Sequence, residues 1–139
     1  MQNSSPIKVI IDTNLWISFL IGKQLSSLKP LLIEGKVQPV FSQQLLDELV
    51  RVTLRPYLHK FFATLIGADL IEFLTAIGHL IDAQSVVTAC RDPKDNYLLA
   101  LAKDSRANFL ITGDQDLMVL KTFEKTVIVT YKDFLEQHY

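Results

Sequence analysis

The chain has 139 residues, the size of one common domain, and its 49% hydrophobic residues suffice for a core, which excludes a disordered protein. Its net charge of −1 gives no overall attraction to nucleic acid, so composition neither requires nor excludes a polyanionic substrate. Since no apolar run reaches the roughly 18 residues of a membrane span and the polar start is unlike a signal peptide, we expect a cytoplasmic protein.

Short runs rich in Val, Ile and Phe alternate with helix-length segments along the chain. Strands are predicted at residues 7–12, 37–41, 85–89, 108–112 and 126–130. These runs are almost continuously apolar, as strands covered on both faces must be. We therefore predict an α/β fold, a three-layer sandwich with a mostly parallel central sheet of about five strands and helices on both faces.

Helices are predicted at residues 14–22, 26–34, 43–54, 58–66, 69–82, 93–106, 115–121 and 131–137. Ser42 can cap the third of these helices, and Pro56 ends it at Arg55. Asp92 can cap the sixth, with Pro93 at its first position. No repeat or linker divides the chain, so we expect a single domain over residues 1–139, ordered from about 7 to 136.

Asp12 follows the first apolar run and opens the segment Asp12-Thr13-Asn14. This position lies at the carboxyl edge of the predicted sheet, where open α/β folds bind their ligands. Capping the next helix is the alternative role for Asp12, but Thr13 or Asn14 could serve equally well. We expect Thr13 and Asn14 to orient the loop by hydrogen bonds.

The helix at 43–54 carries Glu48 at the edge of its apolar stripe, since about 100° per residue separates successive side chains. A carboxylate there can reach a cleft, whereas Asp47 points away from the stripe. Arg51 and Arg55, on the same stretch, are candidate substrate-binding residues, although a solvated outer face would also explain them.

Asp95 shares a helix face with Leu98 and Leu99 and so turns toward the sheet. It could also complement the positive end of the helix, and both roles can hold together. Asn96 contacts either substrate or solvent, and its spacing does not decide which.

The segment after the fourth strand returns two more carboxylates, Asp114 and Asp116, to the same edge of the sheet, with Gly113 suited to a tight turn. One of the two acids is expected to cap the next helix and the other to be functional. The remaining acids of helices and loops are expected to be surface charges: Asp69, Asp82, Asp104 and Asp133.

Carboxylates at the ends of apolar runs lose hydration and raise one another's pKa unless a cation neutralises them. A hard ion such as Mg²⁺ or Mn²⁺ does so through oxygen ligands. We therefore expect metal-dependent phosphoryl-transfer chemistry. The main rival is an aspartyl-phosphate enzyme or receiver domain. Phosphatases of that kind want a second aspartate where Asn14 stands, and a receiver wants a pair of acids before Asp12.

Other chemistries lack their motifs. Three histidines, His59, His79 and His138, have no zinc-site spacing, and there is no nucleotide-binding glycine loop or Gly-x-Ser-x-Gly. The one cysteine, Cys90, cannot form an internal disulfide and is expected to be a small buried residue.

Three segments in this order resemble the PIN domain: Val9–Ser18, Arg91–Asn96 and Leu110–Leu117. The resemblance covers nearly the whole chain, and it is to the VapC-like toxin group of bacterial and archaeal toxin–antitoxin pairs. It implies an endoribonuclease that uses one or two Mg²⁺ or Mn²⁺ ions, and the residues it marks as catalytic are Asp12, Glu48, Asp95 and Asp114.

The same resemblance implies that Asp12, Asp95 and Asp114 bind the metal, with Asp116 as an accessory ligand and Thr112 as a support. The chain departs from the family pattern at Lys94, Asn108 and Tyr131. An antitoxin protein would be a partner, and a homodimer is one option. The alternative is a non-catalytic PIN-like domain that binds RNA or protein, but the presence of all four acids favours catalysis.

Overall fold

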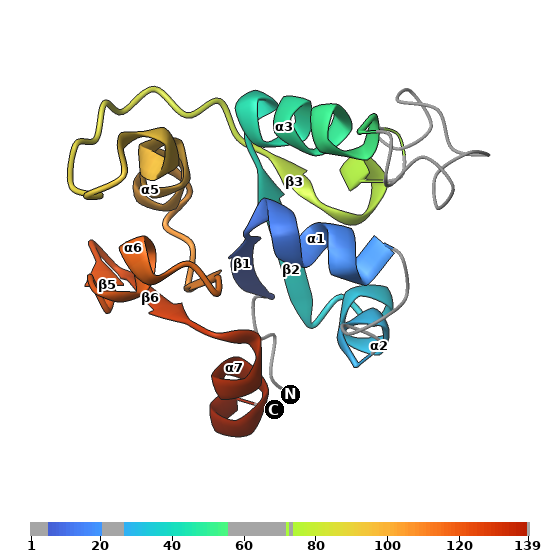
Figure 1. Cartoon of the computed structure of the whole chain (residues 1–139). Helices are drawn as coiled ribbons and strands as arrows, with labels where there is room; N and C mark the ends of the chain where they lie inside the picture. The colour runs from blue at the N-terminus through green and yellow to red at the C-terminus, as the bar shows by residue number, and fades with distance from the viewer. Residues whose placement is uncertain (1–5, 21–26, 56–71, 73, 139) are drawn as a thin grey trace.

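The computed structural model describes residues 6–20, 27–55, 72 and 74–138 of the chain (Figure 1). The strands are β1 (Ile7–Ile11), β2 (Val37–Phe41), β3 (His79–Leu80), β4 (Phe109–Ile111), β5 (Thr122–Phe123) and β6 (Thr126–Val129). The helices are α1 (Thr13–Leu20), α2 (Leu28–Ile33), α3 (Gln43–Thr53), α5 (Asn96–Ser105), α6 (Gln115–Met118) and α7 (Tyr131–His138), with a 3₁₀ turn, η2 (Pro93–Asp95), before α5.

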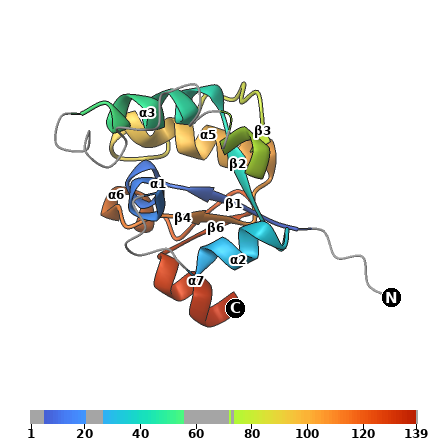
Figure 2. The same cartoon turned by 90° about the vertical axis from the view of Figure 1, so that its right-hand side faces the viewer.

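The sheet is mostly parallel, as predicted. It has six strands in the order β3-β2-β1-β4-β6-β5, and of these pairs β5 with β6 is the antiparallel one. Figure 2 shows α3 and α5 on one side of the sheet and α2 and α7 on the other. The predicted three-layer α/β architecture is therefore confirmed.

The two central strands, β1 and β4, place the residues that follow them side by side. They pair in parallel with Ile11 opposite Ile111, so Asp12 and Thr112 leave the sheet as neighbours. The last three residues of β1 and all of β4 are buried, which explains why both runs are continuously apolar.

An aromatic group anchors α1 to the sheet. Trp16 is fully buried and stacks on Phe41 of β2, with ring centroids 5.3 Å apart, and Phe19 meets its edge at 5.7 Å. Burial of large aromatic side chains is a major source of stability, of order 1.5–3 kcal/mol each. The helix that begins directly after Asp12 is thereby held in place.

The predicted strand at 85–89 is wrong, because this segment has no regular secondary structure. Besides β1, the parallel partner of β2 is β3, which lies inside the region 69–82 predicted as helix, of which residues 72 and 74–77 are helical. The backbone N–H groups of Gln84 and Ser85 donate to the side chain of Asp104, so a carboxylate takes the place of a neighbouring strand. The predicted helix at 58–66 lies outside the described residues.

The predicted helix at 115–121 is too long, since α6 ends at Met118. The chain then turns through Lys121, which has a positive φ of 63°, into β5. Strands of two residues, such as β3 and β5, are too short for a hydrophobic period to reveal them.

Two of the predicted helix caps are confirmed. The hydroxyl of Ser42 accepts a hydrogen bond from Leu45 N at the start of α3, and the carboxylate of Asp92 accepts one from Lys94 N in η2. None of the helices within the described ranges combines the length and the apolar character needed to cross a bilayer.

Candidate metal centre

Asp12 is fixed by hydrogen bonds to both of its carboxylate oxygens. The hydroxyl of Thr112 donates to Oδ2 over 2.7 Å, and the backbone N–H of Asn14 donates to Oδ1 over 3.0 Å. The hydroxyl of Thr112, which is fully buried, accepts in turn from the backbone N–H of Asp114. Asp12 thus both caps the start of α1 and faces the loop after β4.

A cavity of about 310 Å³ opens at this junction, and Asp12, Asn14, Leu15, Gly113 and Asp114 line it. An added Cβ at Gly113 would meet nothing within 4 Å, and Gly113 has no positive φ, so this turn does not require glycine.

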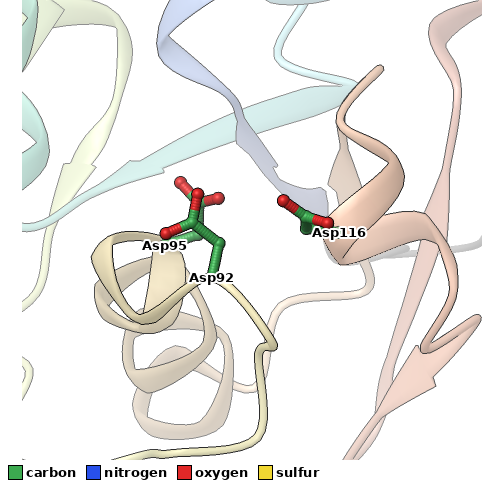
Figure 3. A group of neighbouring side chains, drawn as sticks. All are labelled: Asp92, Asp95 and Asp116. Atoms are coloured by element: carbon green, nitrogen blue, oxygen red, sulfur yellow. The ribbon is translucent and has the colours of Figure 1, made fainter.

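A second group of carboxylates faces this junction. Asp92, Asp95 and Asp116 each offer an oxygen, and these three oxygens lie within 4.8 Å of one another (Figure 3). Asp92 caps η2 and Asp95 is its last residue, whereas Asp116 comes from the first turn of α6. The backbone N–H of Asp116 donates to Asp114 over 2.9 Å, so the two acids of this loop adjoin.

The electrostatics of Asp95 join the two groups into one site. Burial raises the pKa of Asp95 to about 7, and a hydrogen bond with the Asp114 carboxyl and the negative charges of Asp114, Asp92 and Asp12 act in the same direction. Two carboxyl groups share a hydrogen bond only when one of them holds a proton. The site therefore carries more negative charge than its surroundings offset.

Asp95 also provides the test of whether these residues fit a metal ion. Its buried oxygen, Oδ2, receives no hydrogen bond from a donor group in the described part of the chain. A buried carboxylate oxygen without a donor, beside other carboxylates, matches the hard oxygen ligands that Mg²⁺ and Mn²⁺ prefer. The donor set fits such an ion.

Three exposed basic side chains border the acids. Arg91 pairs with Asp116, Lys94 pairs with Asp92 at 3.6 Å, and Arg51 pairs with Glu48. Exposed ion pairs contribute about 0–1 kcal/mol each, so they offset the crowded negative charge only in part.

Glu48 lies on α3, half-buried and paired with Arg51, and its charge acts on Tyr97 of α5. The hydroxyl groups of Tyr97 and Thr13 lie 3.5 Å apart. Burial raises the pKa of Tyr97 to about 12; the bond with Thr13 opposes this shift, and the charges of Glu48, Asp12 and Asp95 add to it. The charges of three predicted site acids therefore act on the pKa of the Tyr97 phenol.

The sequence-predicted residues divide into three sets. The structure brings carboxylate oxygens of Asp95 and Asp116 within 4.8 Å of each other and of Asp92, and the predicted acids Asp12, Glu48 and Asp114 lie outside that group. Asp114 is hydrogen-bonded to Asp95, and Thr112 bonds both Asp12 and the backbone of Asp114. Both Asp114 and Asp116 face the site, although a division of roles was expected, and Asp114 also caps α6.

The second set has structural contacts. Asn96 Oδ1 accepts from the backbone N–H of Cys90 over 2.8 Å, and Thr13 is buried against Tyr97. Cys90 is buried as predicted, and burial raises the pKa of its thiol. The third set is Arg55, which lies one residue beyond Leu54, the C-cap of α3.

Sequence reasoning missed Asp92 and Tyr97 as neighbours of the site. The position of Asp92 before Pro93 predicts only a capping role, but a carboxylate can cap a turn with one oxygen while its other oxygen faces a cluster. Tyr97 carried no signal at all, because an aromatic residue on a buried helix face is ordinary core.

The comparisons with known proteins agree with this geometry. The family model of the PIN domain matches residues 8–116. An uncharacterized protein of Methanocaldococcus jannaschii, MJ1680, is 31% identical over 144 residues, covering 94% of this chain and 91% of the relative. The solved structure of the PIN domain endonuclease Utp24 shares the fold, with a TM-score of 0.52 at 16% identity over 90% of this chain and 85% of that one. The chain, with a nuclease-like fold and a cluster of acids at its sheet edge, belongs to the PIN domain family.

Proposed function

We propose that the protein is an endoribonuclease that depends on Mg²⁺ or Mn²⁺. The observation that supports this most is the group formed by Asp92, Asp95 and Asp116, whose oxygens lie within 4.8 Å of one another and in which Asp95 has a buried oxygen that no donor reaches in the described part of the chain. PIN domains are generally nucleases, so the family supports a nucleic-acid substrate. We propose RNA as that nucleic acid.

In this proposal Asp12, Asp95 and Asp114 hold the ion, with Asp116 and Asp92 at its border. When bound, the ion supplies an activated water and neutralises charge on the phosphodiester. The hydroxyl of Thr112 positions both acids, because it donates to the Asp12 carboxylate and accepts from the backbone N–H of Asp114. Glu48 orients the attacking water, and the guanidinium of Arg51 keeps Glu48 in place.

The net charge of −1 gives no overall attraction to RNA, so the substrate contacts come from exposed basic side chains near the acids. Arg51, Arg91 and Lys94 already lie against the acids, where they can bind the phosphates on either side of the cut. Arg55, which follows the C-cap of α3, is proposed to contact the RNA farther from the cut phosphate.

The biological role we propose is that of a toxin, made harmless by an antitoxin protein, in the cytoplasm and with a single domain over residues 1–139. The resemblance to VapC-like toxins supports it, and a homodimer would fit the same group. Expression of the chain should then arrest growth, and co-expression of the neighbouring gene should relieve the arrest. Growth arrest by an Asp12→Asn variant would count against this role.

The nuclease is tested by incubating purified protein and single-stranded RNA with Mn²⁺. We expect cleavage by the parent and a loss of at least about 100-fold in Asp12→Asn and Asp95→Asn, since removing a group that stabilises transition-state charge costs this much. Asp47→Asn is the control, because Asp47 accepts a bond from Gln43 on the exposed side of α3.

Cleavage that persists in both site variants would show a contaminating nuclease. RNA that binds but is never cut would favour the alternative of a non-catalytic RNA-binding domain.

A further inference from the structure

A second, larger pocket lies beside the carboxylates and takes no part in holding them. It has a volume of about 600 Å³, within the range of roughly 300–1,000 Å³ typical of small-ligand sites. Its walls are the start of α3, the segment that follows β3, and the first turns of α5. Figure 1 shows this segment as the yellow, irregular stretch of chain that leads from β3 to α5.

The irregular wall of the pocket is tied down although it has no secondary structure. The backbone N–H of Ile81 donates to Phe41 O over 2.7 Å, those of Gln84 and Ser85 donate to Asp104, and that of Cys90 donates to Asn96. These bonds fix the backbone before any ligand arrives. A preformed wall reduces the entropy lost on binding.

The lining chemistry indicates what the pocket would hold. Apolar side chains form much of it, and two of them, Leu80 and Val86, are strongly exposed, Val86 by 91%. The amide of Gln44 and the phenol of Tyr97 add polar edges. The described lining has one charged group, Asp82, and no basic side chain, so a phosphate would be repelled.

A flat, uncharged ring with hydrogen-bonding edges suits this lining. Nucleobases of single-stranded RNA are held by stacking on apolar or aromatic side chains and by hydrogen bonds to their edges. A carboxylate accepts a hydrogen bond from an exocyclic amino group, as on cytosine N4, but finds no such donor at that position of uracil. Asp82 therefore favours an amino-bearing base.

The pocket adjoins the carboxylates through two of its lining residues, Asn96 and Tyr97. Asn96, in the pocket wall, directly follows Asp95 in the chain. Tyr97 lines the pocket, and its hydroxyl lies 3.5 Å from that of Thr13, the residue after Asp12. A base bound in the pocket would thus place its own backbone beside the acids.

We infer that this pocket binds one unpaired, amino-bearing nucleobase of the RNA strand next to the phosphate that is cut, and that Asp82 selects it against uracil. The inference rests on the proposed nuclease for its RNA and its cut site. It assigns a role to Asp82, which sequence reasoning treated as an ordinary surface charge.

The test uses cytidine and uridine, which match in size and differ at the position-4 amino group. Each nucleoside is titrated into the metal-free protein, and the backbone amide resonances of Gln44, Ser85 and Tyr97 are followed. We expect cytidine to shift them at about ten-fold lower concentration than uridine, the discrimination typical of one specific base contact. Asp82→Asn should reduce this ratio to less than about two-fold.

Two further variants make the result decisive. Gln44→Trp, at an exposed position of α3, should block the pocket and abolish both titrations, whereas Asp47→Asn on the same helix should change neither. Equal shifts by both nucleosides, no shifts at these amides, or an unchanged ratio in Asp82→Asn would overturn the inference.

The cleavage assay separates this inference from the proposed nuclease. With Mn²⁺, the parent should cut preferentially beside amino-bearing bases, and Asp82→Asn should cut with the preference lost but the Mn²⁺ affinity unchanged. Selective cytidine binding without any RNA cleavage would refute the nuclease and leave the base pocket standing. Cleavage with no base preference, in a protein whose amide resonances do not shift with cytidine, would refute the base pocket and leave the nuclease standing.

Discussion

At the scale of single residues, Asp12 and Asp95 play opposite electrostatic parts. Asp12 has a donor on each oxygen, Thr112 on one and Asn14 on the other, so its charge is supported by the fold itself. Asp95 is half-buried beside other acids, with one oxygen that no donor reaches within the described ranges. A site in which hydrogen bonds stabilise one carboxylate, while another has a buried oxygen without a donor, is typical of a cation-binding centre.

The raised pKa of Asp95, about 7, makes a prediction for stability without metal. Such a carboxyl group favours the folded state below its unfolded pKa near 3.8, and this contribution is lost as the pH rises through about 7. In EDTA, Asp95→Asn should therefore be more stable than the parent at pH 8 by about 1 kcal/mol, a value discounted for partial exposure, and equal to it near pH 3. Urea denaturation at the two pH values measures this.

Asp47→Asn, on the exposed face of α3, serves as the control for that comparison, because its carboxylate lies outside the cluster. A parent that is as stable as Asp95→Asn at pH 8 would show that Asp95 is not under strain in the metal-free fold.

At the scale of secondary structure, close packing rather than a turn explains one of the glycines. Gly78 precedes β3, and a Cβ there would lie 2.4 Å from Phe41 Cε2 and 2.9 Å from the carbonyl oxygen of Pro39. Phe41 is fully buried and stacked on Trp16, so its ring has no room to move aside. This close approach holds the edge strand β3 against the core.

Gly78→Ala should consequently destabilise the protein by about 1–3 kcal/mol, the usual cost of overpacking a core. Gly113→Ala is the matched control, since its added Cβ meets nothing within 4 Å, and it should leave the free energy of unfolding nearly unchanged. Urea denaturation compares the two. Equal stabilities would mean that Phe41 yields to the new methyl group.

Asp104 of α5 accepts backbone hydrogen bonds from the segment after β3, which has no neighbouring strand within the described ranges to accept them. Its carboxylate accepts from Gln84 N over 2.6 Å and from Ser85 N over 2.9 Å, and it also bonds the Ser85 hydroxyl. The Ser85 hydroxyl bond is the main reason why the pKa of Asp104 is lowered. An irregular segment is thus held by one side chain from a helix.

A lowered pKa means that Asp104 adds stability above the unfolded pKa, near 3.8, and that this stability is lost as the pH falls through the folded pKa. Asp104→Asn should cost about 1 kcal/mol at pH 7, with faster hydrogen exchange at the Gln84 and Ser85 amides, and the difference should shrink below about pH 4. Glu136→Gln, at an exposed position of α7, is the control. Unaltered exchange at both amides would refute the anchoring role.

At the scale of the whole molecule, the acids come from elements that are far apart in sequence, so a bound ion would join β1, η2 and α6. Mn²⁺ at a hundred times its Kd should stabilise the fold by about 2.7 kcal/mol, which corresponds to a rise in Tm of roughly 10 °C. Thermal unfolding with and without Mn²⁺ measures the shift. Asp12→Asn should lose most of it, and Asp47→Asn should keep it.

An unmoved melting curve in the parent would remove the metal from the proposal, since any ligand that binds only the folded state must raise Tm. A shift that is equal in the parent and in Asp12→Asn would mean that the ion binds elsewhere.

Much of the architecture could be predicted because it depends on local pattern. The apolar runs that became β1, β2, β4 and β6 are continuous, which indicates strands covered on both faces, and the helical segments between them favour parallel pairing. The segment 85–89 has the same apolar character but is irregular, because the Asp104 carboxylate takes up backbone N–H groups that a sheet would need.

Chain pattern by itself determined that Asp12 and Asp114 follow strands of one mostly parallel sheet, since the carboxyl ends of parallel strands share one edge. Only the tertiary structure decided that Asp92 joins the carboxylates, that Arg91 reaches Asp116, and that Tyr97 meets Thr13. The physical reason is that periodicity sets which face of an element is buried, whereas contacts between side chains of distant elements depend on how loops and packing orient those elements.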